Sequence, residues 1–300
     1  MKKFILHILL FFVIVAVVDV GIGAIGSYLQ SHAKGGRTQQ FDNLVMKDKH
    51  DVLVLGSSRA HSHYDTPFLS DTLGLDVYNG GNDGNGVILA YGILEMMLER
   101  YQPKVVVFDV EPAFDIVEYD QDFNHTRYIS HLKPYYRKRA ASEIIKDIST
   151  EEWRKVQSGM IRYNTEIVEI LVDNVLDRGV EKCGYLPLNG KMEKEPDAKA
   201  SKPPVLDTFK LKYIEKLINL CQSHGLTLIL VGSPKYGVKD SFELQPVKDI
   251  ANKHGVRFLD YYAEPIFMEH KDWFKEPMHL NNEGARQFSR LLANDLKSVL

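Results

Sequence analysis

The stretch DVLVLGSSR, which spans residues 51–59, decides the fold of this chain. Its apolar run ends in one glycine and two serines, a pattern typical of a short strand that is buried on both faces of a parallel sheet and followed by a tight turn. We therefore expect the folded body to begin at Asp51. Similar apolar runs predict further strands, and they occupy residues 75–78, 104–110, 226–231 and 256–259.

Helical patterns separate these predicted strands. Residues 87–100 and 208–224 each have the length and apolar spacing of a crossover helix, and residues 281–300 repeat this spacing at the end of the chain. Alternating strands and helices are typical of the α/β class. The sequence therefore predicts a three-layer α/β/α fold with a doubly wound parallel sheet over residues 51–300.

A long charged region interrupts this alternation between residues 115 and 204. Part of it has helical spacing, and a turn-rich stretch follows. We interpret it as a helical insertion between two sheet strands. Its aromatic side chains leave two interpretations open, because they can line a substrate cleft or form a small core of the insertion itself. They are Tyr135, Tyr136, Trp153, Tyr163 and Tyr185.

Residues 1–30 read as a membrane segment. Residues 4–18 carry no formal charge, and with the stretch up to Leu29 they give about 26 mostly apolar residues, enough to cross about 30 Å of hydrocarbon. Such a segment is an uncleaved anchor or a secretory signal, and the poor cleavage site after it favours the anchor. The lysines at positions 2 and 3 predict a body outside the cytoplasm, in a periplasm or at a cell surface. Residues 31–50 are polar and are expected to form a linker.

Composition argues against several classes of protein. The 300 residues are 44% hydrophobic and 26% charged, as in compact globular proteins. A net charge of −3 provides no basic field for a nucleic acid. Cys183 and Cys221 form no CxxC pair, and no set of histidines and carboxylates has metal spacing, so we expect no metal site. No glycine-rich phosphate-binding motif follows a strand, which argues against a nucleotide-binding protein.

Two short segments at opposite ends of the predicted domain carry groups suited to nucleophilic catalysis. Ser57 and Ser58 follow the first strand, and ligands of open parallel sheets bind beyond the carboxyl ends of the strands. Near the C-terminus, Glu276 stands three residues before His279. A carboxylate can orient an imidazole, which can then take a proton from a serine hydroxyl. Each segment alone is a common turn or surface pair, but together they predict a serine nucleophile with its base.

These two segments and the glycine-rich turn YNGGNDGNG at residues 78–86 resemble the SGNH/GDSL hydrolase superfamily, in the same order and over nearly all of residues 51–300. The resemblance implies a flavodoxin-like fold and a serine chemistry that needs no cofactor. It implies Ser58 as the nucleophile, His279 as the general base and Glu276 in the place of the usual aspartate. The sequence looks most like the membrane-anchored Gly-Ser-Ser relatives, which acylate or deacylate envelope polymers.

The resemblance also implies an oxyanion hole built from backbone amides. Gly84 falls at the family's offset for the glycine donor, and Gly81 and Gly86 are alternatives in so glycine-rich a turn. A glycine lets the backbone approach a tetrahedral oxyanion, and the amide of Ser58 would supply a second donor.

One motif of the family is missing. The family places Gly-x-Asn after the third strand, whereas this chain has Asp109 and Glu111 there. A carboxylate beside an oxyanion repels it unless the carboxylate is protonated or turned away. Either the side chain of Asn82 or Asn85 supplies the missing donor, or the activity is reduced. We include Asn82 in the predicted oxyanion hole.

Arg59 and Asn79 are candidates for contacts with the substrate. Arg59 would bind an anionic group, and the alternative is that it pairs with a neighbouring carboxylate such as Asp65 or Asp83. Asp272 is a second candidate for the acid that orients the histidine.

The sequence predicts a membrane-tethered serine esterase or O-acyltransferase that acts on ester groups of an extracytoplasmic glycan. Among these esters, O-acetyl groups are the favoured candidates. For a transferase, the resemblance implies a multi-spanning membrane partner that donates the acyl group. Asp19 in the anchor is a candidate contact for it, or else a hydrated residue at the outer interface. The alternative is an accessory or binding subunit of an envelope acylation system with a weak or lost active centre. The missing motif favours this alternative, and the retained Ser58, His279 and Glu276 oppose it.

Overall fold

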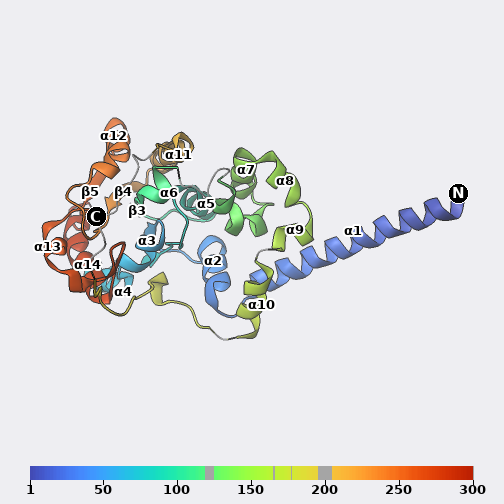
Figure 1. Ribbon diagram of the computed structural model, residues 1–300, viewed down its shortest axis with the longest axis horizontal. Helices are drawn as coiled ribbons and strands as arrows, with labels where there is room; N and C mark the ends of the chain where they lie inside the picture. Colours follow the sequence, from blue (N-terminus) through green and yellow to red (C-terminus); the bar gives the residue numbers. More distant parts are fainter. Residues whose placement is uncertain (119–124, 165, 177, 195–204, 300) are drawn as a thin grey trace. The chain divides into compact units, whose positions relative to one another are not determined.

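The computed structural model describes residues 1–118, 125–164, 166–176, 178–194 and 205–299. The chain divides into two compact units. An N-terminal unit consists of residues 1–43 and 124–180, and a sheet unit consists of residues 44–123 and 181–300. Their elements are labelled in Figure 1.

Five parallel strands form the centre of the sheet unit, in the spatial order β2-β1-β3-β4-β5. This is the flavodoxin-like order, in which the sheet is wound in both directions from β1. Every residue of β1 and β3 is buried, as expected for strands covered on both faces. The strands are β1 (Val52–Leu55), β2 (Val77–Asn79), β3 (Val105–Asp109), β4 (Thr227–Gly232) and β5 (Arg257–Asp260).

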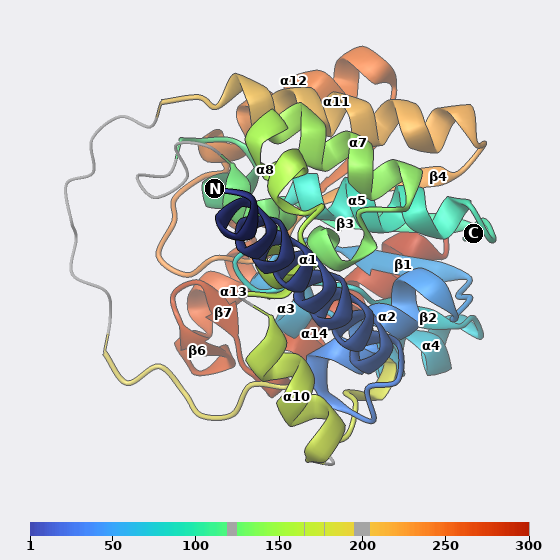
Figure 2. The same cartoon turned by 90° about the vertical axis from the view of Figure 1, so that its right-hand side faces the viewer.

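Helices cover both faces of this sheet, so the predicted α/β class is confirmed. Helix α11 contacts α5 and α12, whereas α14 contacts α3 and α4, and the two sets lie on opposite sides of the strands in Figure 2. Side-chain caps begin several of these helices, for example Asp65 for α4 and Asn281 for α14. Their bounds are α3 (Ser58–His63), α4 (Thr66–Leu73), α5 (Val87–Leu98), α11 (Thr208–Ser223), α12 (Gln245–His254) and α14 (Asn282–Leu296).

Short elements complete the sheet unit. Strands β6 and β7 pair in an antiparallel hairpin just before α14. The others are helical segments in the connections between strands. Their bounds are α6 (Pro112–Asp115), η2 (Lys182–Gly184), η3 (Phe242–Leu244), α13 (Pro265–Glu269), η4 (Lys271–Trp273), β6 (Phe274–Glu276) and β7 (His279–Leu280).

The N-terminal unit is helical in its described residues. Residues 31–50, expected as a linker, contain helix α2, which crosses the division between the units. The described part of the expected insertion at residues 115–204 supplies the other short helices. The unit contains α1 (Lys2–Ser31), most of α2 (Gly36–Met46), η1 (Thr126–Tyr135), α7 (Arg139–Ile148), α8 (Thr150–Lys155), α9 (Gly159–Tyr163) and α10 (Ile167–Val175).

The aromatic residues of the insertion differ in their roles. Tyr135 and Tyr163 are buried within the N-terminal unit, and the hydroxyl of Tyr135 donates to Asp42 at 3.0 Å. Tyr185 belongs to the sheet unit, where its hydroxyl donates to Asn282 at 2.9 Å. For Tyr135 and Tyr163 the structure therefore favours a small core over a substrate cleft.

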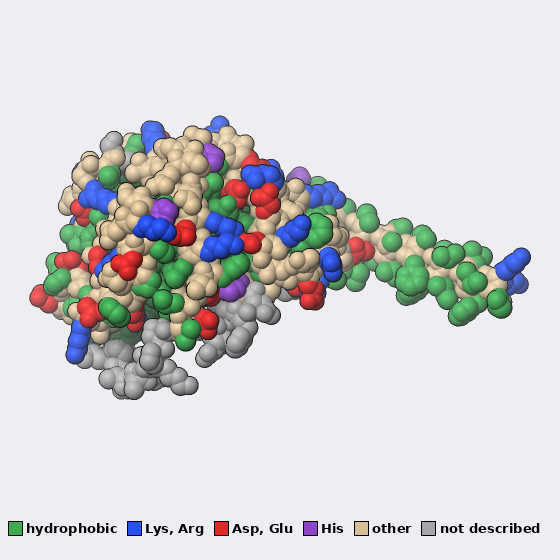
Figure 3. Space-filling model, turned by 90° about the horizontal axis from the view of Figure 1, so that it is seen from above, with side chains coloured by type: hydrophobic (Ala, Val, Ile, Leu, Met, Phe, Trp, Pro, Cys, Tyr) green, Lys and Arg blue, Asp and Glu red, His purple; other side chains and the backbone are tan. Residues whose placement is uncertain are grey.

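Helix α1 is long and apolar enough to cross a membrane, with a mean hydropathy of 2.9 in its most apolar window. Residues 1–18 are exposed, and Figure 3 shows apolar side chains covering this part of the helix out to the lysines at its end. Farther along, Gly23, Gly26 and Gln30 are buried. The helix therefore has a bare part and a part that packs against its own unit.

Candidate active site

The turn between β1 and α3 presents Ser58 at the carboxyl end of the sheet. Gly56 has a φ of +144°, and a Cβ there would lie 2.8 Å from the carbonyl oxygen of Asp109, so the turn requires glycine. Ser57 caps α3, because its hydroxyl accepts the amide hydrogen of Arg59. Ser58 is thereby the first residue of α3 and is partly exposed.

The β6–β7 hairpin brings His279 and Glu276 to this serine. Ser58 Oγ lies 2.7 Å from His279 Nε2. The other ring nitrogen, Nδ1, is hydrogen-bonded to Glu276 Oε1, and Glu276 Oε2 accepts the amide of Met278 at 3.0 Å. The three side chains form one line of hydrogen bonds in the order Ser, His, Glu, which is the arrangement of a catalytic triad.

The electrostatics of Glu276 suit this arrangement. Partial burial raises the pKa of Glu276, but the hydrogen bonds from His279 and from the Met278 amide outweigh burial and leave the pKa below its usual value. The carboxylate is therefore ionised near neutral pH and holds a proton on Nδ1 of His279. The lone pair of Nε2 then faces Ser58 Oγ, as a general base requires. The His279 side chain is 27% exposed, so a substrate can reach the pair.

His63 fixes the strand that carries His279. Its Nε2 accepts the amide of Leu280 at 3.0 Å, and its Nδ1 lies 3.0 Å from Ser233 Oγ. Burial and the charge of Arg59 lower the pKa of His63 well below its usual value, so the ring is neutral. Helix α3 therefore carries both the serine and the group that positions the histidine. The sequence gives no sign of this second role beyond the five-residue spacing of His63 from Ser58.

Arg59 is part of a buried network, so its predicted role in substrate binding is wrong. It is 1% exposed, and its guanidinium donates to Glu111 Oε2 at 2.7 Å and to Ser233 Oγ. The alternative, that Arg59 pairs with a neighbouring carboxylate, is confirmed, but the carboxylate is that of Glu111 and neither that of Asp65 nor that of Asp83. Asp65 instead pairs with Arg286 and Asp83 with His61. A guanidinium with so little exposure has no free face for a substrate.

The same network explains the missing family motif. Asp109 is fully buried, and its Oδ1 accepts the hydroxyl of Tyr64 at 2.7 Å and the amide of Ser233 at 3.2 Å. Burial raises the pKa of Asp109. Glu111 is also buried and is paired with Arg59. The acidic side chains of Asp109, at the end of β3, and of Glu111, just after it, are therefore turned into the interior, which removes the expected repulsion of an oxyanion.

Asn79 is buried and has a structural role, which corrects its prediction as a substrate contact. Its amide nitrogen donates to the carbonyl of Ala60 at 2.7 Å and to that of Tyr64 at 3.3 Å. Its Oδ1 accepts the amide of Gly81 at 2.9 Å. All its bonds therefore join β2 to α3 and to the glycine-rich turn.

The glycine-rich turn packs directly on α3. A Cβ at Gly81 would lie 2.4 Å from the amide nitrogen of His61. The amide of Gly81 is committed to Asn79, and that of Asn82 donates to the carbonyl of Gly56 at 2.9 Å, so neither is an oxyanion donor here. These contacts hold the turn against the start of α3.

Two residues of the predicted oxyanion hole, Asn82 and Gly84, stay predictions, and the structure gives only their local geometry. The side-chain amide of Asn85 donates to Asn82 Oδ1 at 2.7 Å, and this bond orients the side chain of Asn82. Asn82 Nδ2 has no hydrogen bond among the described residues. Gly84 has a φ of +70°, in the region that favours glycine. Asn82 and Gly84, together with the Ser58 amide, remain the predicted donors.

Asp272 lies away from the histidine of the triad. Its carboxylate is 3.6 Å from Nδ1 of His270 and 3.7 Å from the ammonium of Lys191, while its carbonyl accepts the side chain of Asn281. The structure therefore brings Glu276, and not Asp272, to His279.

A buried histidine, His61, follows Ser58 closely in the sequence, but the sequence gives it no role. His61 lies 2.9 Å from Asp83 Oδ1 through Nδ1 and 2.7 Å from Glu181 Oε2 through Nε2. Burial lowers the pKa of His61, but the two carboxylates outweigh burial and raise the pKa to about 9. The ring is therefore charged at neutral pH. It ties Asp83 of the glycine-rich turn to Glu181, which lies 120 residues after His61 in the chain.

Metal ligation has no support in the part of the chain that the structure describes, where no group of three or more His, Cys, Asp or Glu side chains is placed to hold an ion.

Comparisons with known proteins give structural likenesses alone. No protein-family model matches the chain, and no curated protein matches it. One similar solved structure is a putative lipolytic protein of the G-D-S-L family from Desulfitobacterium hafniense DCB-2, at 10% identity and a TM-score of 0.39, covering 81% of this chain and 97% of the other. An acetyl xylan esterase has 12% identity and a TM-score of 0.40, over 83% and 99% of the two chains. A gut microbial diltiazem-metabolizing enzyme has 14% identity and a TM-score of 0.34, over 82% and 46%. With scores this low, the likenesses say nothing about activity, which depends on the residues of the site.

Proposed function

We propose that this chain is a membrane-tethered serine esterase or O-acyltransferase of the SGNH/GDSL kind, with Ser58, His279 and Glu276 as its catalytic residues. The observation that carries the proposal is the 2.7 Å contact between Ser58 Oγ and His279 Nε2, continued through Nδ1 to Glu276. A serine and a histidine 221 residues apart meet in this geometry at the carboxyl end of a parallel sheet, where such folds bind ligands.

In the proposed reaction Ser58 Oγ attacks the carbonyl carbon of an ester while His279 Nε2 takes the hydroxyl proton. The tetrahedral oxyanion is stabilised by the amides of Ser58 and Gly84 and by the side chain of Asn82. The C–O bond to the alcohol then breaks, and His279 gives its proton to the leaving oxygen. The acyl group stays on Ser58 until a second hydroxyl attacks it with the same general base.

That second hydroxyl decides between hydrolysis and transfer. Water gives an esterase, and a sugar hydroxyl gives an acyltransferase, with the same three residues in both. The exposed apolar part of α1, within residues 1–18, supports a body tethered to a membrane, and the lysines at positions 2 and 3 support an orientation away from the cytoplasm. We propose that the substrate is an O-acetylated glycan in that compartment.

The test uses the full chain in detergent and two readouts. The first is turnover of p-nitrophenyl acetate at pH 8, and the second is labelling by a fluorophosphonate probe, which needs only an activated serine. Ser58→Ala should abolish labelling, and both Ser58→Ala and His279→Ala should lower turnover by about 10⁴-fold or more. Labelling of the parent also reveals a transferase that lacks its acceptor and turns over little ester.

Two matched variants control for the chemistry of the substituted side chains. Ser223→Ala removes an exposed hydroxyl at the end of α11, and His270→Asn removes a partly exposed imidazole after α13. Both should retain the parent's turnover. A parent that neither labels nor hydrolyses ester would reject the catalytic proposal and favour an accessory or binding subunit.

A further inference from the structure

Helix α9 docks its N-terminus on the side chain of Asp19, inside the N-terminal unit. Asp19 Oδ1 accepts the hydroxyl of Ser158 at 2.6 Å and the amide of Met160 at 3.0 Å, and Oδ2 accepts the amide of Gly159 at 2.9 Å. The backbones meet closely, because a Cβ at Gly159 would lie 2.6 Å from the Cα of Gly23. The start of α9 is therefore held against α1 at the level of Asp19.

This contact sets how deep α9 lies. At about 1.5 Å per residue, Asp19 is about 22 Å along α1 from Phe4, the first apolar residue, and Ile25 is about 31 Å along it. The hydrocarbon core of a bilayer is about 30 Å thick. In a membrane crossed by α1, the start of α9 thus lies within the outer half of the hydrocarbon, about 8 Å from its edge, and Ile25 lies at that edge. There the hydroxyl of Ser158 and the amides of Gly159 and Met160 donate to the carboxylate of Asp19 with little competition from water.

The outward face of α10 is apolar. Val168, Leu171 and Val175 follow each other at helical spacing, and they are 68%, 45% and 79% exposed. The buried residues of the helix include Asp173, whose carboxylate accepts the amide of Thr38 at 3.0 Å. A helix on a water-exposed surface has most of its apolar residues inside, whereas α10 buries Ile170 together with Asp173 and exposes three other apolar residues. Helix α10 is therefore arranged for apolar surroundings, as in helices that lie in a membrane interface.

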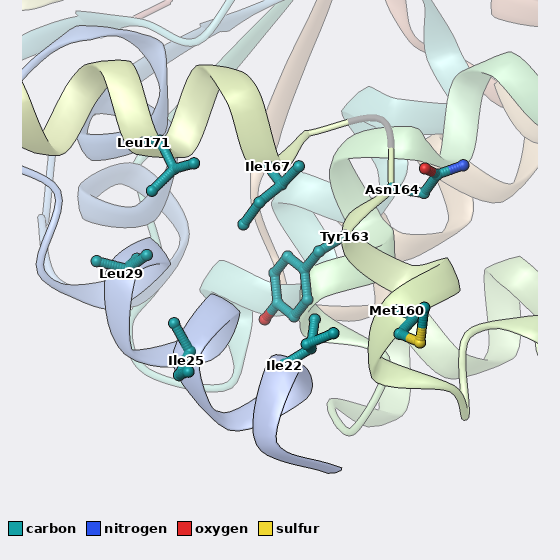
Figure 4. A pocket seen from close by; sticks show the side chains of 8 residues that line it. All are labelled: Ile22, Ile25, Leu29, Met160, Tyr163, Asn164, Ile167 and Leu171. Carbon is teal, nitrogen blue, oxygen red and sulfur yellow. The ribbon is translucent and has the colours of Figure 1, made fainter. Parts of the chain in front are cut away.

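A groove of about 410 Å³ lies between α1 and the pair α9 and α10. Ile22, Ile25 and Leu29 of α1 form one wall, and Leu171 belongs to the other. Tyr163 stands between the two walls in Figure 4. Its hydroxyl has no hydrogen-bond partner among the described residues. The α1 wall spans the level at which the hydrocarbon gives way to headgroups, since Ile22 is about 27 Å and Leu29 about 37 Å from Phe4.

We propose that α10 and this groove form a lipid-contact surface. Helix α10 lies along the outer leaflet of the membrane that α1 crosses, and the groove takes an acyl chain of a phospholipid from that leaflet. The apolar surface of the anchor continues into the groove, because one wall of the groove belongs to α1, the helix whose residues 1–18 are exposed. The anchor, the groove and the outward face of α10 then all contact the hydrocarbon of the same membrane.

A multi-spanning protein partner would offer a similar apolar surface, and lipid is favoured for two reasons. The depth fixed by Asp19 places the groove in the bilayer whether or not a partner is present. In addition, Asp19 is the ionisable side chain of α1 best suited to contact such a partner, and its carboxylate is already occupied by three donors of its own unit.

The first experiment places a tryptophan in the groove of the full chain. Leu171→Trp is reconstituted into nanodiscs of phosphatidylcholine and phosphatidylglycerol, with or without bromine on the acyl chains. We expect its added fluorescence to be blue-shifted and quenched by the brominated lipid. Glu143→Trp, on the exposed face of α7, is the control and should be neither shifted nor quenched. Spectra of the parent are subtracted, because Trp153 and Trp273 emit in all samples.

A second variant covers the case in which the larger side chain disturbs the fold. Val168→Cys is a change of similar volume, made in a chain that carries Cys183→Ser so that the buried Cys221 is the remaining native thiol. In the same nanodiscs, a charged maleimide should label residue 168 several-fold more slowly than Glu143→Cys. The proposal would be overturned if brominated lipid did not quench the tryptophan at position 171 and the cysteine at position 168 were labelled at the control rate. These results would assign the surface to a protein partner.

Discussion

Helices α14 and α10 belong to different units and differ in the side chains that they expose. Helix α14 buries Phe288 and Leu292 and exposes Arg290, whereas α10 buries Asp173 and exposes Val175. Both have apolar residues at helical spacing, so their sequences look alike. The difference supports our proposal that the N-terminal unit has a surface that meets lipid, whereas α14 follows the pattern of a helix at a water-exposed surface.

Polar side chains also serve different purposes in the two units. In the sheet unit, charged groups around Ser58 are buried in pairs that surround the candidate active site. In the N-terminal unit, the carboxylates of Asp19 and Asp173 bind backbone amides and so hold helices together. The following predictions test this division, beginning with the chemistry.

Glu276→Gln should lower the turnover of p-nitrophenyl acetate by about 10⁴-fold, with little change in the stability of the fold. A glutamine that donates to Nδ1 of His279 places the ring proton on Nε2, where it faces Ser58 and blocks its activation. Asp272→Asn is the matched control and should keep the parent's rate. An equal loss in both variants would contradict the assignment of the acid.

Arg59→Met should destabilise the sheet unit by about 3–5 kcal/mol, because it leaves Glu111 buried without its cation. Urea unfolding followed by circular dichroism measures the change. The double variant Arg59→Met with Glu111→Leu should regain most of this stability. A double variant as unstable as the single one would show that the pair is not what Arg59 supports.

The charged state of His61 should make stability depend on pH. Its folded pKa of about 9 lies above the ordinary histidine value, so its contribution of about 3 kcal/mol is complete below pH 6.5 and is lost as the pH rises through 9. Unfolding of the parent and of His61→Gln across pH 6 to 10 measures this. The variant should lose the pH-dependent part, and parallel curves would reject the assignment.

Asp19→Ala should loosen α9 by about 1–2 kcal/mol, because the helix loses three hydrogen bonds to a carboxylate. Trypsin cleavage after Arg154 and Lys155, in nanodiscs, should become about tenfold faster, since cleavage follows the population of the open form. Glu143→Gln, which removes a surface charge in the same unit, should leave the rate unchanged. Equal rates in all three proteins would show that Asp19 does not hold α9.

The fold and the proposed triad were more accessible from the sequence than the surroundings of the site. Short apolar runs that end in turn residues predict buried strands, because their pattern is local. Ser58, His279 and Glu276 were identified from two local motifs and a family resemblance. The structure brings these three side chains together.

The errors concern burial and long-range pairing. Arg59 and Asn79 are polar residues in the two motifs of the candidate site, and nothing local shows that they face the interior. The contact of His61 with Glu181 joins residues 120 positions apart, and the polarity of α10 depends on what surrounds it. Side chains whose partners come from distant segments are set by the tertiary fold, so a single sequence does not reveal them.

The distance along the chain between Ser58 and its base has a consequence for biosynthesis. At about 5–20 residues per second, the ribosome needs about 10 to 40 seconds to add the 221 residues that separate the two. Until His279 emerges and α14 packs against α3, the serine has no partner to activate it. A chain exported through the membrane during its synthesis would thus stay chemically silent until almost all of it has crossed.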